Sequence, residues 1–99
     1  MTSQDSLARL AAVIESRSPA QGGNPDASYV ARLLAKGPDA FLKKIGEEAT
    51  EVVIDAVTGN EMRLPEEVAD LLYHLLVLLV AKDVALDDIM NVLEKRHRK

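Results

Sequence analysis

The run from Leu71 to Ala81 limits most strongly how this chain can fold, because only Tyr73 and His74 within it carry polar groups. A helix that is apolar on every side has to be covered on every side. A helical chain of 99 residues can hardly cover one such long helix completely by itself. The run therefore predicts a partner subunit, most simply a second copy of the chain in a two-fold dimer.

The composition favours helices over strands. Aromatic residues are only 3% of the chain, and Leu, Val and Ala make up most of its apolar residues, which is typical of helical proteins. Apolar residues at helical spacing predict five helices in a single all-α domain over residues 1–99. We expect these helices at residues 5–16, at 29–36, at 39–57, from Met62 or Pro65 to Ala81, and from Asp87 or Asp88 into a basic tail at 94–99.

Capping and turn residues predict where the helices begin and end. Ser28 and Asp39 are expected to cap the second and third helices. Gly59 is expected to end the third helix in the left-handed conformation. Pro65 fits the first turn of a helix and leaves the start of the fourth helix open between two positions. Residues 18–25, "SPAQGGNP", are expected to form a loop.

Charge and composition exclude several classes of function. The net charge of -4 argues against nucleic acid as a partner, because phosphate binding needs a basic surface. The absence of cysteine excludes disulfides and thiolate metal sites. The apolar run at residues 75–81 is too short to span a bilayer, so no membrane is expected. No N-terminal apolar run follows a basic stretch, so we expect no signal peptide. A cytoplasmic protein is the simplest expectation.

Two groups of acidic residues lie at matched distances from Gly59. Glu51 precedes it by eight residues and Glu67 follows it by eight, while Glu48 and Asp70 are each eleven residues away. If Gly59 is the tip of an antiparallel helical hairpin, each pair reaches one level, about 12 to 16 Å from the tip. Four carboxylates would then converge on one point.

The helical positions of these acids predict partial burial. Successive residues of a helix are about 100° apart, which places Glu48 at the edge of an apolar arc and Glu51 just beyond it. Glu67 and Asp70 continue a stripe that later carries His74. Partly buried carboxylates repel one another unless they are protonated or bridged by cations. Oxygen ligands of this kind suit Mg²⁺ or Mn²⁺.

The spacing alone leaves two interpretations open. Glutamate is a good helix former, and a cluster of glutamates is commonly a solvated helix face. The matched spacing on the two helices favours a cation site instead. A cation held by carboxylates usually holds phosphates in turn, so phosphoryl or nucleotidyl chemistry would be the natural extension.

The acidic motifs, EExxE at residues 47–51 and ExxD at residues 67–70, resemble those of the all-alpha nucleoside triphosphate pyrophosphatases, the MazG-like superfamily. Within it, "SYVARLLAKG" at residues 28–37 and "ADLLYHLLVLL" at residues 69–79 resemble the phosphoribosyl-ATP pyrophosphohydrolase family, over roughly residues 5–97. The resemblance implies a MazG-like bundle of about five helices completed by dimerisation. It also implies Mg²⁺-dependent hydrolysis of 1-(5-phosphoribosyl)-ATP to 1-(5-phosphoribosyl)-AMP and pyrophosphate, the second step of L-histidine biosynthesis.

The resemblance also implies roles for individual residues. The acids that match the family's metal ligands are Glu48, Glu51, Glu67 and Asp70, with Mg²⁺ as the expected ion and Mn²⁺ as a substitute. Glu47 matches the first acid of its motif and would hold a further cation or orient the attacking water. The expected catalytic residues are thus Glu47, Glu48 and Glu51. The expected substrate contacts are Lys44, Arg32, Lys36 and Ser28.

The same resemblance predicts the partners: a homodimer that binds phosphoribosyl-ATP, with a separate cyclohydrolase chain acting next in the pathway. Two alternatives remain at this point. One is a house-cleaning pyrophosphatase for non-standard nucleoside triphosphates, and the other is a non-catalytic helical dimerisation module. Of the nearby polar residues, we expect His74 to be a core residue and Asp55 to be solvated.

Overall fold

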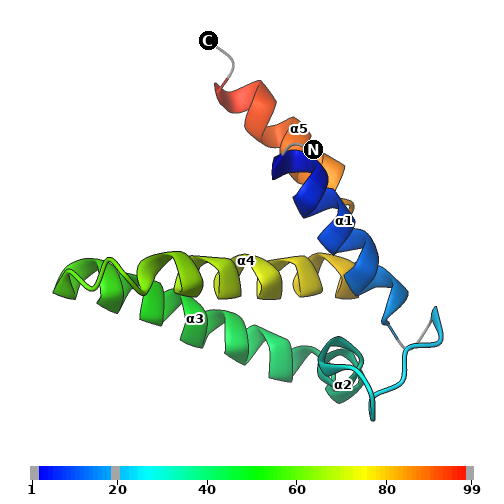
Figure 1. Ribbon diagram of the computed structural model, residues 1–99. Helices are drawn as coiled ribbons and strands as arrows, with labels where there is room; N and C mark the ends of the chain where they lie inside the picture. Colours follow the sequence, from blue (N-terminus) through cyan, green and yellow to red (C-terminus); the bar gives the residue numbers. More distant parts are fainter. Residues whose placement is uncertain (1–2, 19–20, 98–99) are drawn as a thin grey trace.

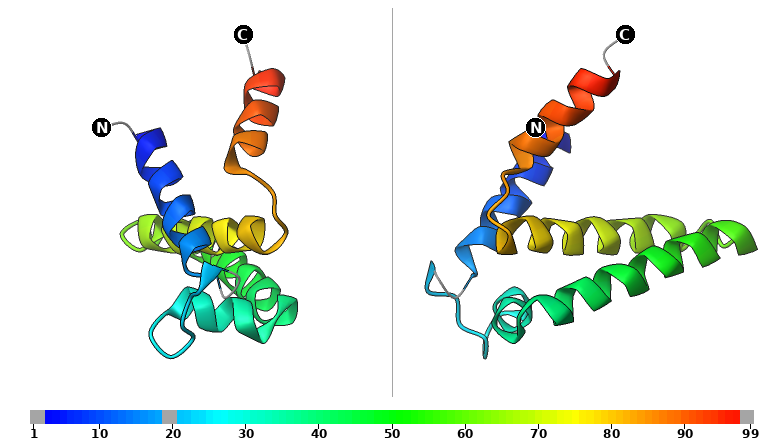
Figure 2. Two further views of the ribbon diagram at one scale, coloured as in Figure 1. Left: turned by 90° about the vertical axis from the view of Figure 1, so that its right-hand side faces the viewer. Right: turned by 180° about the vertical axis from the view of Figure 1, so that it is seen from behind.

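The computed structural model describes residues 3–18 and 21–97, and this part of the chain contains helices and no strands, as expected. The helices are α1 (Ser3–Ser16), α2 (Tyr29–Lys36), α3 (Pro38–Thr58), α4 (Leu64–Ala81) and α5 (Leu86–His97). Helices α3 and α4 form a long antiparallel hairpin, and α2 lies across the end where α3 begins (Figure 1). Helices α1 and α5 rise from the same end of α4 as two separate arms (Figure 2).

Two of the expected helix ends are confirmed, and α4 begins between the two positions that the sequence left open. The Ser28 side chain accepts a hydrogen bond from the backbone N–H of Ala31 at 3.2 Å and so caps α2. Gly59 is left-handed, with φ 76° and ψ 19°, and ends α3. Helix α4 begins at Leu64, so that Pro65 lies in its first turn, where its missing N–H removes no helical hydrogen bond.

The N-cap expected at Asp39 is wrong. Helix α3 begins at Pro38, two residues before the start that a cap at Asp39 implies, so Asp39 lies inside its first turn. Proline fixes a helical φ and therefore favours the first position of a helix. Gly37, between α2 and α3, has a φ of 93°. Residues with a side chain rarely adopt this backbone conformation, and glycine adopts it easily.

The N-caps expected at Asp87 or Asp88 are wrong for a related reason. Helix α5 begins at Leu86, and both acids lie in its first turn. An acid in the first turn is stabilised by the positive end of the helix much as a capping acid is, so composition does not separate the two positions. The expected basic tail is helical as far as His97. Residues 98 and 99 of that tail, and residues 19 and 20 of the expected loop, lie outside the described residues.

The buried core lies at the end of the hairpin that adjoins α2. Its members come from α1 to α4: Ile14, Val30, Leu33, Phe41, Leu76 and Val77. Nearer Gly59 the apolar side chains are open to solvent, with Val53 59%, Val57 81% and Met62 90% exposed. One half of the hairpin is therefore packed by the chain's own helices, and the other half is not.

The apolar helix that predicted a partner is only partly covered by its own chain. On α4, Leu76 and Val77 are buried, but Val68 and Leu72 are exposed. Helix α5 contributes no buried residue, so it adds little cover. Within the described residues, no helix combines the length and the apolar character that crossing a membrane requires.

Candidate metal and catalytic site

Three carboxylates meet between α3 and α4 near the middle of the hairpin. One oxygen from each of Glu48, Glu67 and Asp70 lies within 4.8 Å of the other two. Glu48 and Glu67 are only 8% and 4% exposed, whereas Asp70 is open to solvent. The meeting of Glu48 with Asp70 confirms the register that their equal distances from Gly59 predicted.

Glu51 joins this group through Glu67. A hydrogen bond to Glu67, followed by the negative charge of Glu67, raises the pKa of Glu51. The second pair predicted from the spacing about Gly59 is therefore also adjacent. Glu51 is exposed, so the group has two buried members and two that face solvent.

One oxygen of Glu67 lacks a partner when the neighbouring carboxyl groups are ionised. Oε1 accepts a hydrogen bond from Arg63 Nη2 at 2.8 Å, while Oε2 is buried and then meets no donor among the residues that the structure describes. The hydrogen bond from Arg63, followed by one with Glu51, lowers the pKa of Glu67, so this carboxyl is ionised at neutral pH. A buried, ionised oxygen without a partner is unfavourable. A hard divalent cation among these three carboxylates would satisfy it, and the ligand set fits Mg²⁺ or Mn²⁺.

Lys44 lies beside the acids on α3. Its Nζ is 3.3 Å from Glu48 Oε1 and 4.0 Å from Glu47 Oε2. The hydrogen bond to Glu48 raises the pKa of Lys44, so the ammonium group stays charged and available to an anionic phosphate. Glu47 is exposed and lies next to this ammonium group, outside the compact group formed by Glu48, Glu67 and Asp70.

His74 connects the acids to α2. Its Nδ1 is 2.7 Å from the Asp70 carbonyl oxygen, and its Nε2 is 2.8 Å from the Tyr29 hydroxyl. Because a carbonyl only accepts hydrogen bonds, Nδ1 carries the proton, and in the neutral ring Nε2 accepts from Tyr29. Burial raises the pKa of Tyr29, and the nearby charges of Lys44 and Glu48 also act on it. The expected core histidine is confirmed, and it brings Tyr29 to the site.

The three residues of α2 and its cap that were expected to contact substrate differ in their surroundings. Ser28 is buried, and its hydroxyl oxygen is used in capping the helix. Arg32 Nη1 donates to the Pro25 carbonyl at 3.1 Å, and its charge is among those that act on the pKa of Tyr29. Lys36 is the last residue of α2, about 12 Å beyond Ser28 along the helix axis.

Two further residues at the site were not expected from the sequence. Asp55 is half-buried, and its Oδ2 is buried with no donor in the described part of the chain, so the expectation of a solvated side chain is wrong. With Glu51, Arg63 and Glu67 it lines a groove of about 350 Å³. The spacing of Arg63 and Glu67, four residues apart on one helix, is a signal that could have revealed the pair. The burial of Asp55 depends on the neighbouring turn, which the spacing does not show.

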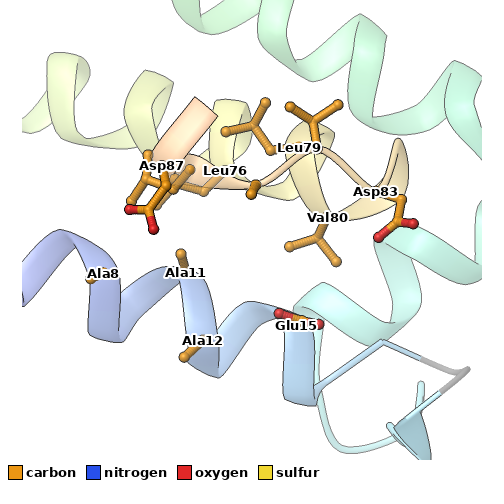
Figure 3. A pocket seen from close by; sticks show the side chains of 12 residues that line it. Ala8, Ala11, Ala12, Glu15, Leu76, Leu79, Val80, Asp83 and Asp87 are labelled. Carbon is orange, nitrogen blue, oxygen red and sulfur yellow. The ribbon is translucent and has the colours of Figure 1, made fainter. Parts of the chain in front are cut away.

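A second groove, of about 370 Å³, lies between α1 and the end of α4. Figure 3 shows small side chains of α1 on one side and larger apolar side chains of α4 on the other. The labelled residues that line it are Ala8, Ala11, Ala12, Glu15, Leu76, Leu79, Val80, Asp83 and Asp87. None of the four converging acids belongs to this lining, so the groove is separate from the candidate metal site.

Comparisons with known proteins identify the family of the chain. The family model described as phosphoribosyl-ATP pyrophosphohydrolase matches residues 7–97. The chain belongs to this family. A phosphoribosyl-ATP pyrophosphatase from Acidovorax sp. is 58% identical over 98 residues, which are 95% of this chain and 74% of the relative. The proteins of that name from Variovorax paradoxus and Cereibacter sphaeroides are 56% and 54% identical, over 97% and 91% of this chain and 79% and 84% of their own lengths.

Membership in the phosphoribosyl-ATP pyrophosphohydrolase family confirms the resemblance that the motifs predicted. The matched segment, residues 7–97, contains both acidic motifs. The family is one of hydrolytic enzymes, which favours the catalytic interpretation over a non-catalytic dimerisation module.

Proposed function

We propose that this chain hydrolyses 1-(5-phosphoribosyl)-ATP to 1-(5-phosphoribosyl)-AMP and pyrophosphate, the second step of L-histidine biosynthesis. The observation that carries the proposal is the convergence of Glu48, Glu67 and Asp70, with one oxygen of Glu67 unpartnered, in a chain of this family. The names of the relatives support the choice of substrate over other nucleoside triphosphates.

The converging acids would hold the divalent cation. Glu48, Glu67 and Asp70 supply three oxygens close together, and Glu51 stands beside Glu67 as a fourth ligand. When bound, Mg²⁺ or Mn²⁺ neutralises phosphate charge and polarises a phosphoryl oxygen. Two of the acids are buried, so their carboxylates are held in place by the helices before substrate arrives, which reduces the cost of ordering the site.

The chain's own polar groups would position the reactants. The Lys44 ammonium group, held next to Glu48, contacts the triphosphate. Exposed Glu47 beside it accepts a hydrogen bond from the attacking water and orients it. The water oxygen forms a bond to the α-phosphorus, the bond from that phosphorus to the bridging oxygen breaks, and the electron pair leaves with pyrophosphate. The proton of the water passes to a carboxylate or to solvent.

We further infer a homodimer that uses the half of the hairpin nearer Gly59. Val53 and Val57 of α3 and Val68 and Leu72 of α4 are exposed there. Apolar side chains on adjoining helices form the kind of surface that a second copy covers in a two-fold dimer. The acids lie beside this surface, so dimerisation would also shield the site from water on that side.

Release of pyrophosphate by the purified chain with Mg²⁺ tests the proposed reaction. The substrates are phosphoribosyl-ATP and a panel of ordinary and modified nucleoside triphosphates. We expect release from phosphoribosyl-ATP, and a loss of roughly a hundredfold or more in Glu48→Gln, because loss of a metal's outer partners alone costs 10- to 100-fold. Glu61→Gln, an exposed acid near the tip, is the matched control and should keep full activity.

The other outcomes distinguish the alternatives. Release only from nucleoside triphosphates would keep the metal chemistry and replace the biosynthetic substrate with a house-cleaning role. No release from a folded, dimeric protein would favour the non-catalytic dimerisation module.

A further inference from the structure

Arg63 pairs with one carboxylate oxygen of Glu67, next to the oxygen that the proposed metal ion would bind. The arginine side chain is 60% exposed, and its Nη2 reaches Oε1 of a Glu67 side chain that is only 5% exposed. The guanidinium group therefore provides positive charge at a buried carboxylate in the metal-free protein. A divalent cation next to the same carboxylate would repel the guanidinium group, because two positive charges at short range in a poorly solvated site interact strongly.

Asp55 offers a second position for that arginine. Its Oδ2 is buried and has no donor within the described residues, and it lines the same groove as Arg63 and Glu67. It also lies in the last turn of α3, which carries no basic residue. A negative charge at the C-terminal end of a helix is unfavourable, and a cation there is favourable. Oδ2 of Asp55 thus has no hydrogen-bond donor in the described part of the chain, and the last turn of α3 has no basic residue to offset its charge.

The electrostatics of Arg63 connect the two acids. The hydrogen bond to Glu67 and the charge of Glu67 are the main causes that raise the pKa of Arg63, and the charge of Asp55 is the next. Arginine has five N–H donors in a planar fork and a flexible stem. A change in its side-chain torsions can therefore exchange one carboxylate for the other without any movement of the helices.

We propose that Arg63 is a positioning residue that pairs with Glu67 in the metal-free protein and transfers to Asp55 when a divalent cation binds the acids. The inference rests on the metal site of the proposed function. In this arrangement Arg63 limits repulsion among the acids before the metal binds. Asp55 then receives the displaced guanidinium group, which would otherwise oppose the metal, and holds it at the edge of the site.

Binding of Mn²⁺ to the full chain, measured by titration calorimetry, tests this exchange. Arg63→Gln removes the competitor and should lower the Kd for Mn²⁺ about two- to fivefold, the effect of losing an exposed ion pair. Asp55→Asn removes the receiving group and should raise the Kd by a similar factor. Lys43→Gln and Glu61→Gln make the same charge changes at exposed positions and control for the general electrostatic effect.

The double variant Arg63→Gln/Asp55→Asn separates exchange from simple charge. If Asp55 acts by receiving Arg63, then Asp55→Asn in the Arg63→Gln background should change the Kd no more than Glu61→Gln does. Additive effects of the two substitutions would overturn the exchange, and so would an unchanged or raised Kd in Arg63→Gln. Thermal unfolding of each metal-free variant confirms that it is folded.

The wild-type titration distinguishes failure of this inference from failure of the proposed function. If the wild-type chain binds no Mn²⁺, the metal site itself is wrong and the exchange falls with it. If it binds Mn²⁺ and releases pyrophosphate from phosphoribosyl-ATP, but the variants behave additively, only the exchange is wrong.

Discussion

The two halves of the α3–α4 hairpin contain similar apolar residues but differ greatly in burial. Next to α2, Phe41 and Val77 are 2% and 0% exposed, whereas next to Gly59, Val57 and Met62 are 81% and 90% exposed. The acids lie where one half passes into the other. The chain's own core therefore holds the site from one side only, and the other side is open to a substrate and to a second copy of the chain.

Removing core volume from the packed half should have the largest effect. Phe41→Ala is expected to lower the free energy of unfolding by about 3–5 kcal/mol, because it leaves a cavity among buried side chains. Urea unfolding at a fixed protein concentration measures the change. Leu42→Ala is the matched control, since this neighbouring side chain is 43% exposed, and its loss should be much smaller. Equal losses in the two variants would contradict the contrast between the two faces of α3.

A substitution at the boundary between the halves should affect chemistry more than folding. Glu67→Gln keeps the shape of the side chain and removes the charge that would bind the metal, so kcat/KM should fall roughly a hundredfold or more. Steady-state assays of pyrophosphate release measure this loss. The adjacent, exposed Glu66 provides the control Glu66→Gln, which should remain active. A fully active Glu67→Gln would show that the acids are not the metal site.

A charge placed in the open half should act on association. Val57→Asp is expected to weaken dimerisation by about 30-fold or more, if the valine is a central contact worth about 2 kcal/mol. Sedimentation velocity over a range of concentrations gives the dimer Kd. Val92→Asp places the same charge on α5, at a valine that is 45% exposed, and should have less effect. A larger effect of Val92→Asp than of Val57→Asp on the dimer Kd would place the interface on α5 instead.

The smallest expected effect concerns the cap of α2, the helix that covers only the packed half. Ser28→Ala should lower stability by about 1 kcal/mol, and Ser28→Asn should restore most of it, because asparagine also caps helices well. The KM for phosphoribosyl-ATP should stay within about twofold. A raised KM with unchanged stability would instead make Ser28 a substrate contact. Thermal unfolding and steady-state kinetics on the same variants separate these results.

The meeting of the acids could be predicted because helix geometry is regular. Each residue adds a fixed rise and rotation, so equal distances from Gly59 were enough to place Glu48 near Asp70 and Glu51 near Glu67. The amphipathic pattern also predicted partial burial at Glu48, which is confirmed. Similarly, the all-apolar character of α4 predicted the exposed face that the single chain leaves uncovered.

Features that depend on contacts between distant segments could not be predicted in this way. Tyr29 reaches the site only because α2 lies across the end of the hairpin, where its hydroxyl group donates a hydrogen bond to Nε2 of His74. Asp55 is half-buried and lines a groove with Asn60 and Arg63 of the turn after α3, although its helical position suggested solvent. The capping errors have a local cause, because aspartate is favourable both before a helix and in its first turn.

The symmetric register about Gly59 divides the hairpin into parts that differ in their tolerance of changes in length. One residue added to α3 between Glu51 and Thr58 would turn the acids about 100° around the helix axis and shift them about 1.5 Å along it. The same addition in the short connection from Asn60 to Arg63, outside both helices, can be absorbed by the loop, since longer loops cost little. The turn can thus vary in length, while the number of residues between each acid and its end of the helix has to stay matched on α3 and α4.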